Sequence, residues 1–350
     1  MLNQASKLAI LCDFMFNPAR DIEVFGMFGA GNLGDEAMLV AARQELGARR
    51  CVPWKYYRNR LLNGLVLSRR HGNLFVVGGT LIHGGKTDWL DYVEHRFDQK
   101  VPVSFFGTGM AFTEDQIAGQ SDSYKRWARI LRGSRHVHLR GPASAGLAQG
   151  MGARAGVFGD FAFLLHDPER PPARPQDRRN IIGLNFGQCL GDQEDFERRA
   201  AALVSELAGR HELIFHAVVE GDVPVTLRIA SAAGLCLDEA GIEKHYRDPR
   251  AFMDSVRHYR AFLGLKMHAA GLAMIAGVPS LMIAYLPKAR DFMAPLGRDD
   301  LLIDLPVDVE GTLEKLARLL DDPGSGILAD RIGAVHAGQR RILRDVLAGL

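Results

Sequence analysis

Two side chains that can carry positive charge stand at the start of an almost wholly apolar helix late in the chain. Lys266 directly follows the predicted strand Ala261–Leu265, and His268 begins the predicted helix His268–Ile275. A helix N-terminus is the positive end of the helix dipole, so cations there are unfavourable unless an anion binds beside them. Lys288 adds a further cation shortly after the next predicted strand. These residue types at this spacing predict a site for a phosphate or carboxylate group.

A glycine-rich loop near the beginning of the chain is the second candidate. Gly29, Gly31 and Gly34 fit the spacing G-x-G-x-x-G between the predicted strand Glu23–Phe28 and the predicted helix Asp35–Leu46. Glycines allow the backbone to approach an anion closely. A dinucleotide-binding interpretation also requires an acidic residue about 20 positions later, at the end of the next strand. That region contains none, so the spacing alone does not indicate a dinucleotide cofactor.

Three polar side chains, Asn32, Asp35 and Glu36, accompany this loop. The two carboxylates would repel a pyrophosphate, which further disfavours a dinucleotide. All three could cap the helix that begins here, because such side chains accept hydrogen bonds from free backbone N–H groups. A pair of carboxylates on a ligand-facing loop is also placed for general acid and base catalysis. Both interpretations stay open on the sequence.

Two more glycine turns follow predicted strands. One contains Gly78 and Gly79, with His83 in the loop beyond, and the other contains Gly107 and Gly109. The glycines could serve only the turns, and a lone histidine is more often a satisfied polar residue than a catalyst. Because ligands of parallel α/β sheets bind outside the carboxyl ends of the strands, the turns together predict one ligand-facing surface.

Arg140 stands at the end of the predicted strand His136–Leu139 and just before the predicted helix Ala143–Met151. A guanidinium group there can hold a carboxylate or a phosphate through two parallel hydrogen bonds. A surface ion pair is the alternative interpretation.

Short apolar runs alternate with helical patterns along the chain, which is typical of βαβ units and parallel sheets. A length of 350 residues suggests two domains, and the proline-rich, charged segment Asp167–Arg179 is a suitable linker. We expect an N-terminal α/β domain over residues 1–170 and a C-terminal one over residues 171–350, with packing of the last helix on the N-terminal domain as an open alternative. The predicted fold class is α/β, with two doubly wound Rossmann-like domains facing a cleft.

The predicted elements have defined limits. The further strands expected are Leu8–Cys12, Leu74–Val77, Val101–Phe106, Ala155–Val157, Asn180–Asn185, Glu212–Val218 and Ser280–Ala284. The further helices expected are Asp122–Leu131, Glu194–Ala208, Val223–Ala233, Pro249–Arg257, Gly311–Leu320 and Asp330–Leu347.

The composition, with 47% hydrophobic and 24% charged residues and a net charge of +2, is ordinary for a soluble protein. It gives no argument for nucleic acid, and no apolar run is long enough to span a membrane. The four cysteines lack metal-ligand spacing, so we expect no metal site and buried thiols in a reducing compartment. We therefore expect a cytoplasmic protein; the basic stretch Lys55–Arg70 either contacts the inner face of the membrane or is simply solvated.

These motifs together resemble the polysaccharide pyruvyltransferase family. The matching segments run in order from about residue 26 to 297, and are Gly31–Ala37, Gly78-Gly79, Gly107–Gly109, Arg140 with Ser144, Gly159-Asp160, Lys266–Ala269, Gly277–Pro279 and Tyr285–Lys288. Two departures stand out. The family's usual Arg-Leu-His is Lys266-Met267-His268 here, which keeps the charge but loses the guanidinium fork, and Thr108 replaces a usual glutamine.

The resemblance implies a fold similar to GT-B glycosyltransferases, with the acceptor in the N-terminal domain and the donor in the C-terminal one. The donor would be phosphoenolpyruvate, with no further cofactor. The product would be a pyruvate ketal on a sugar of a cell-surface polysaccharide, such as an exopolysaccharide, or on its lipid-linked precursor. A pocket of Lys266, His268, Arg140 and the helix start at Ala269, with Tyr285 nearby, suits a donor that carries a phosphate and a carboxylate.

The catalytic roles implied are hypotheses. His268 could be the acid that protonates the donor or a clamp on its phosphate. Asp35 or Glu36 could take the proton of the sugar hydroxyl.

Three other functions are alternatives. A GT-B glycosyltransferase would bind a nucleotide sugar and need an acidic residue for the ribose, for which Asp291 is available. A dinucleotide-dependent oxidoreductase is disfavoured by the missing acid and by Asp35. A non-catalytic carbohydrate-binding subunit would have no use for the Lys266 and His268 charges. The first and third alternatives stay open.

Overall fold

The computed structural model describes residues 22–46, 50–53, 72–85, 88–321 and 325–350. The predicted strand Leu8–Cys12 and the basic stretch Lys55–Arg70 lie outside these residues. The chain divides into two compact units. Unit 1 comprises Met1–Gly31, Asp35–Leu164 and Gly338–Leu350, and unit 2 comprises Asn32–Gly34 and Leu165–Ala337.

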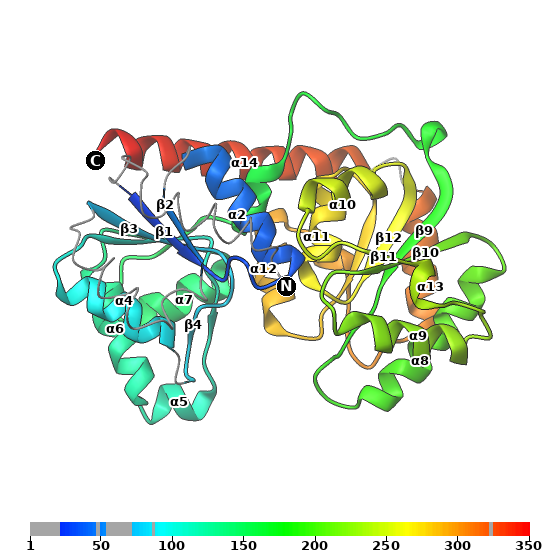
Figure 1. Ribbon diagram of the computed structural model, residues 1–350, viewed down its shortest axis with the longest axis horizontal. Coiled ribbons are helices and arrows are strands. Elements are labelled where there is room, and N and C mark those ends of the chain that lie inside the picture. Colours follow the sequence, from blue (N-terminus) through cyan, green and yellow to red (C-terminus); the bar gives the residue numbers. More distant parts are fainter. Residues whose placement is uncertain (1–21, 47–49, 54–71, 86–87, 322–324) are drawn as a thin grey trace. The chain divides into compact units, whose positions relative to one another are not determined.

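Unit 1 contains a six-stranded parallel sheet in the order β2-β1-β3-β5-β7-β8 (Figure 1). The strands are β1 (Ile22–Gly26), β2 (Arg50–Pro53), β3 (Asn73–Val77), β5 (Val103–Phe106), β7 (His136–Leu139) and β8 (Gly156–Val157). The helices are α2 (Leu33–Leu46), whose first two residues count with unit 2, α4 (Asp88–Asp98), α5 (Glu114–Ala118), α6 (Asp122–Gly133) and α7 (Pro142–Gly150). A separate two-stranded pair joins β4 (Ile82–His83) to β6 (Met110–Ala111).

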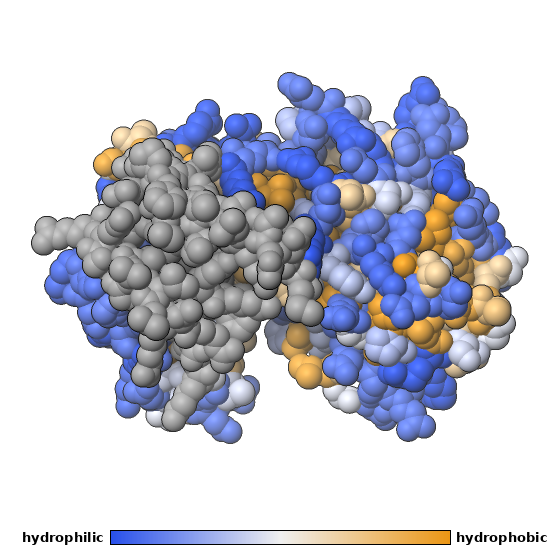
Figure 2. All heavy atoms as spheres, in the orientation of Figure 1, coloured by the Kyte–Doolittle hydropathy of each residue, from blue (hydrophilic) through white to orange (hydrophobic). Residues whose placement is uncertain are grey.

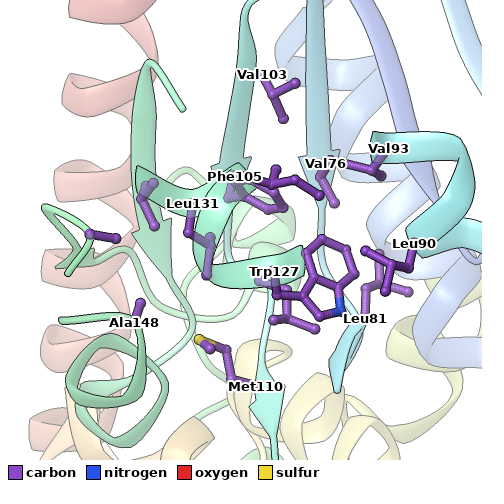
Figure 3. Packing of buried hydrophobic residues seen from close by; sticks show 14 of the residues in the cluster. Val76, Leu81, Leu90, Val93, Val103, Phe105, Met110, Trp127, Leu131 and Ala148 are labelled. Atoms are coloured by element: carbon purple, nitrogen blue, oxygen red, sulfur yellow. The ribbon is translucent and has the colours of Figure 1, made fainter. Parts of the chain in front are cut away.

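The core of unit 1 lies between its sheet and helices α4 and α6. Trp127 of α6 is completely buried, and its ring meets that of Phe105 of β5 edge-on at 6.2 Å between centroids. Leu90 and Val93 of α4 pack into the same cluster (Figure 3). Every residue of β1, β3 and β5 is buried, as expected for parallel strands covered on both faces.

The C-terminal segment Gly338–Leu350 packs within unit 1. The side-chain amide of Gln339 is buried and donates to the carbonyl of Asp160 at 2.8 Å. Arg340 pairs with Glu45 of α2 at 3.1 Å. These contacts hold the segment against the loop after β8 and against α2.

Unit 2 contains a second six-stranded parallel sheet, in the order β11-β10-β9-β12-β13-β14. The strands are β9 (Arg179–Asn185), β10 (Glu212–Ala217), β11 (Ile242–Lys244), β12 (Tyr259–Gly264), β13 (Ser280–Ile283) and β14 (Leu302–Ile303). The helices are α8 (Gln193–Ala208), α9 (Asp222–Ala232), α10 (Pro249–Val256), α11 (Met267–Ile275), α12 (Pro287–Met293), α13 (Val309–Asp321) and α14 (Ser325–Ala348), the last of which continues into the segment counted with unit 1.

The predicted α/β class with two doubly wound parallel sheets is confirmed, and most element limits agree within two residues. The strand predicted from Val101 begins at Val103, because Pro102 has no N–H to donate to a sheet. The proline-rich segment has only a 3₁₀ turn, Pro175–Asp177, before β9 begins at Arg179. Several elements were not predicted from the sequence, among them the helices α4 and α12 and the short strands β2, β11 and β14.

Surface features correct one expectation. Cys236 is exposed and Cys189 is partly exposed, contrary to the prediction of buried thiols, because both lie in loops rather than in strands or helices.

Figure 2 shows hydrophilic residues over much of the coloured surface. In the part of the chain that the structure describes, no helix combines the length and apolar character that crossing a membrane requires.

Candidate functional site

The predicted ligand-facing residues of unit 1 follow four neighbouring strands, β1, β3, β5 and β7. Backbone hydrogen bonds join the turns side by side. Gly78 N–H donates to Phe106 at 3.1 Å, Gly107 N–H to His138 at 2.9 Å, and Gly109 N–H to Gly79 at 2.7 Å. Gly78, Gly79 and Gly107 have φ angles of 60°, 66° and 67°, a conformation that favours glycine. The glycines therefore shape one continuous edge at the carboxyl ends of the strands.

Arg140 is the cation of this edge. Its side chain is 1% exposed, and Nη1 donates to the Thr80 hydroxyl at 3.3 Å. The guanidinium lies directly on Gly109, where a Cβ atom would overlap Nη2 and lie 2.8 Å from Nη1. Such burial contradicts the alternative of a surface ion pair. Gly109 is therefore required for the position of Arg140 rather than only for the turn.

Two hydroxyl groups beside Arg140 have structural partners. Ser144 of α7 is buried and accepts a hydrogen bond from Met110 N–H at 2.9 Å. Thr108, which stands where the family usually has glutamine, is also buried and donates to Val76 O at 3.3 Å. Both hydroxyls tie the glycine turns to the sheet.

The side chains of the first glycine loop hold the loop itself. The Glu36 carboxylate is 8% exposed and accepts hydrogen bonds from Gly29 N–H at 2.9 Å and Gly31 N–H at 3.4 Å. The Asn32 side chain accepts from Gly34 N–H at 2.9 Å. The capping interpretation therefore describes Asn32, whereas Glu36 holds the loop that precedes α2. Asp35, in the first turn of α2, is partly exposed and is the carboxylate better placed for acid and base chemistry.

His83, on β4, is partly buried. Its Nδ1 accepts a hydrogen bond from Gly85 N–H at 3.0 Å, and its ring packs edge-on against Trp89 at 5.3 Å. Burial lowers the pKa of His83 below its ordinary value. The imidazole is therefore neutral at pH 7, with the proton on Nε2, because Nδ1 acts as the acceptor.

The second group of predicted residues gathers in unit 2 around Lys266. This residue caps the start of α11, and its N–H donates to the side chain of Asn185 at 3.0 Å. Its ammonium group lies 3.7 Å from the Asp222 carboxylate and 3.3 Å from the carbonyl of Gln188. The expectation of uncompensated charges at this helix start is thus wrong for Lys266, because a carboxylate from another part of the unit faces it.

Asp222 is the main residue of this group that was not predicted from the sequence. Its side chain is fully buried, and one oxygen accepts hydrogen bonds from Val218 N–H, Val219 N–H and the Asn185 amide at 3.0, 3.2 and 3.2 Å. Burial raises the pKa of Asp222, although Lys266 and these donors act in the opposite direction. The carboxyl group therefore positions Lys266, and removing its charge from water costs free energy.

Tyr285 is shared by two ammonium groups. The Nζ atoms of Lys266 and Lys288 lie 5.6 and 5.4 Å from the centre of its ring, within the range of cation–π attraction. Burial raises the pKa of Tyr285 to about 12, and the Asp222 charge adds to this effect. The phenol is neutral at pH 7, so two ammonium groups converge on one neutral ring, and the Asp222 carboxylate lies beside one of them.

His268 occupies the first turn of α11, two residues after Lys266. Its ring is partly exposed and meets the ring of Phe292 edge-on at 6.5 Å. It also lies against Gly34, where a Cβ atom would overlap Nδ1 and lie 2.7 Å from Cε1. Gly34 is therefore needed to leave space for the imidazole.

The structure limits what Ala269 and Asp291 could contribute to ligand binding. Ala269 is buried and its N–H already donates to Lys266 O at 2.9 Å, so this amide is engaged within the helix. Asp291, considered for a ribose, is only 5% exposed.

The family model described as polysaccharide pyruvyl transferase matches residues 32–287. This range includes the candidate site residues except Gly29, Gly31 and Lys288, the last two of which lie one position beyond its ends. A comparison with curated proteins found no match.

The fold is similar to that of several solved enzymes. The UDP-GlcNAc 2-epimerase from Neisseria meningitidis, solved with UDP-GlcNAc bound, has a TM-score of 0.56 and 12% identity, covering 93% of this chain and 99% of that one. Trehalose-6-phosphate synthase OtsA has a TM-score of 0.53 and 12% identity, with 96% and 83% covered. A kitacinnamycin glycotransferase has a TM-score of 0.52 and 12% identity, with 94% and 98% covered. These similarities show the fold alone, and that fold is GT-B.

Proposed function

The chain belongs to the polysaccharide pyruvyl transferase family, and we propose that it transfers pyruvate from phosphoenolpyruvate to a sugar of a polysaccharide or its precursor. The observation that carries the choice of donor is the convergence of Lys266 and Lys288 on Tyr285, beside His268 at the start of α11. Phosphoenolpyruvate carries a phosphate and a carboxylate. Two ammonium groups suit these two anionic groups, and we assign unit 2 to the donor.

The proposed reaction begins with the enol carbon of the donor. His268, as its imidazolium, gives a proton to the methylene carbon, which becomes a methyl group and leaves an oxocarbenium ion at the neighbouring carbon. A sugar hydroxyl attacks that carbon and loses its proton. The bond from carbon to the phosphate oxygen then breaks, and a second hydroxyl closes the cyclic ketal as it loses its proton. The sum is one phosphoenolpyruvate plus one sugar diol giving one ketal plus inorganic phosphate.

Each charged residue has a defined role in this proposal. Lys266 and Lys288 hold the anionic groups of the donor and stabilise the negative charge on the departing phosphate. Asp222 positions Lys266. In unit 1, Asp35 is the proposed acceptor of the hydroxyl proton, and Arg140 is proposed to orient anionic or hydroxyl groups of the substrates from the edge of that unit's sheet.

Binding of the donor can be measured without knowing the acceptor. Phosphoenolpyruvate at about 100 times its dissociation constant should stabilise the protein by about 2.7 kcal/mol in a thermal-shift series. Lys288→Ala should bind it at least about tenfold more weakly, because one charge-assisted contact is lost. Arg290→Ala is the matched control, since Arg290 lies two residues further along α12, is largely exposed and pairs with Asp304. Equal binding by wild type and Lys288→Ala would contradict the assignment.

The same series tests the rival function. UDP-GlcNAc should give no shift if the donor is phosphoenolpyruvate, and stabilisation by UDP-GlcNAc alone would favour a nucleotide-sugar glycosyltransferase. The catalytic role of His268 is tested by His268→Asn, which should still bind phosphoenolpyruvate but release no phosphate with a panel of sugar diols. Full phosphate release by that variant would reject His268 as the acid.

A further inference from the structure

Two histidines and a glutamate come together at one edge of the unit 2 sheet. His216 lies on β10 and Glu243 lies opposite it on the neighbouring strand β11. His245 follows β11 directly, and its N–H donates to Ala217 O at 2.9 Å, which continues the pairing of the two strands. One atom from each of the three side chains lies within 4.8 Å of the others.

His216 is the unusual member of this cluster. It is completely buried, and within the described chain neither of its ring nitrogens has a hydrogen-bond partner. The rings of Phe252, Tyr259 and Phe262 surround it at centroid distances of 5.5, 5.7 and 5.6 Å. A buried polar group with no partner is costly and rare in folded proteins. The position of this imidazole therefore calls for a partner that its protein neighbours do not supply.

The orientation of the ring shows where that partner would be. Nδ1 of His216 faces the Glu243 carboxylate at 3.6 Å, too far for a hydrogen bond. The same carboxylate oxygen lies 3.1 Å from Nε2 of His245.

We propose that His216, Glu243 and His245 bind a divalent transition-metal ion with the ligand preferences of zinc. Nitrogen and oxygen ligands at about 2.0–2.2 Å from a tetrahedral zinc ion lie roughly 3.3–3.5 Å from one another. The two separations from Glu243, 3.6 and 3.1 Å, bracket this value. Two imidazoles with one carboxylate favour zinc over calcium or magnesium, which take oxygen ligands.

The surroundings give the ion a route and an open position. The side chains of Glu243 and His245 are 41% and 14% exposed, whereas that of His216 is fully buried. An ion can therefore enter past Glu243 and meet His216 at the closed end. Three protein ligands leave a fourth position for water.

The site would connect to the contacts around Lys266 through the backbone of β10. The carbonyl of His216 accepts a hydrogen bond from the Asn185 amide at 2.9 Å. The same Asn185 side chain bonds Asp222 and Lys266 N–H. A metal ion that joins the ends of β10 and β11 would thus fix the strand that carries this network. This effect on the strand does not depend on the proposed pyruvyl transfer.

The experiment uses the full-length protein, stripped with a chelator and dialysed. Zinc is titrated in competition with a chromophoric chelator, and cobalt(II) is added separately to record its visible absorption. We expect one equivalent of zinc and the intense bands of a four-coordinate cobalt site. Glu243→Gln and His245→Ala should each weaken zinc binding by about 10-fold or more. Both side chains are partly exposed, so these variants are expected to fold.

The control is His211→Ala. His211 lies just before β10, away from the cluster, and bonds the side chain of Asn180. This variant should keep the full equivalent of zinc. No stoichiometric binding by wild type would overturn the proposal. So would equal binding by wild type, Glu243→Gln and His245→Ala, because it would mean that zinc binds elsewhere on the chain.

Discussion

The carboxyl edges of the two sheets look alike in sequence, because each has turns and polar residues after apolar strands, but they are built differently. In unit 1, polar side chains such as Glu36 and Ser144 are engaged by backbone amides, and Arg140 is buried against Gly109. In unit 2, two ammonium groups share one tyrosine ring, and one of them faces a buried carboxylate. The first edge holds one buried cation, and the second gathers two ammonium groups and one buried carboxylate around a tyrosine ring.

The largest effect should come from filling the space beside the unit 2 charges. A Cβ atom on Gly187 would overlap the Asp222 carboxylate and lie 2.8 Å from Cε of Lys266. Because the site is buried, Gly187→Ala should destabilise the protein by about 2–3 kcal/mol and abolish binding of phosphoenolpyruvate. Urea unfolding and calorimetric titration measure the two effects.

The control for this change is Gly221→Ala in the same unit. Nothing lies within 4 Å of a Cβ atom there, and φ is −68°, so the change should be neutral or stabilising by about 0.4–1 kcal/mol. If Gly187→Ala behaved like its control, the close packing of Asp222 and Lys266 would be disproved.

A smaller effect is expected at the corresponding glycine of unit 1. Gly109→Ala places a methyl group against the guanidinium of Arg140. The tip of a long side chain can shift, so we expect a loss of about 1–2 kcal/mol. Gly146→Ala in α7, where no atom lies within 4 Å of the added carbon, should instead stabilise by up to about 1 kcal/mol. Equal unfolding midpoints for the two variants would show that Arg140 does not depend on Gly109.

The pH dependence of stability should show how much the buried charge of Asp222 destabilises the folded protein. The pKa of Asp222 is raised by burial, so its folded state holds a proton more tightly than the unfolded chain, whose Asp pKa is about 3.9. The contribution of Asp222 to the free energy of unfolding is complete below the pKa of the unfolded chain. It is lost as the pH rises through the pKa of the folded state. Wild type should therefore lose stability relative to Asp222→Asn as the pH rises above about 4. The opposite trend in urea unfolding would mean that the pair with Lys266 dominates.

Local sequence was sufficient for the features that depend on a few neighbouring residues. The strand-end glycines and the Lys266 and His268 pair follow from turn chemistry and from a strand that passes directly into an apolar helix. The parallel sheets follow from the alternation of strands and helices. These are the parts of the fold and site that could be predicted.

The missed features depend on contacts between distant segments. Asp222 reaches Lys266 only because β10 and β12 lie on either side of β9. The three-residue strand β11 gives no periodic pattern, so the approach of Glu243 to His216 could not be foreseen. Glu36 accepts backbone hydrogen bonds within its own loop. A catalytic acid could occupy the same position at a helix start, so the sequence does not distinguish the two roles. Only the three-dimensional contacts distinguish a structural role from a catalytic one at such positions, because the residue types are the same in both cases.

The smallest effect tests the departure from the family's usual arginine at Lys266. Lys266→Arg should keep the contact with Asp222, which now lies 3.7 Å from the ammonium, and offer a further donor to the ligand. One added hydrogen bond is worth about 0.5–1.5 kcal/mol, or roughly 2- to 10-fold in affinity for phosphoenolpyruvate. Lys266→Met, which keeps the stem without the charge, should bind weakly. Calorimetry that found Lys266→Arg weaker than wild type would show that the close approach of Gly187 fits lysine and excludes the larger guanidinium, and the unit 2 site would then be shaped for a single compact charge.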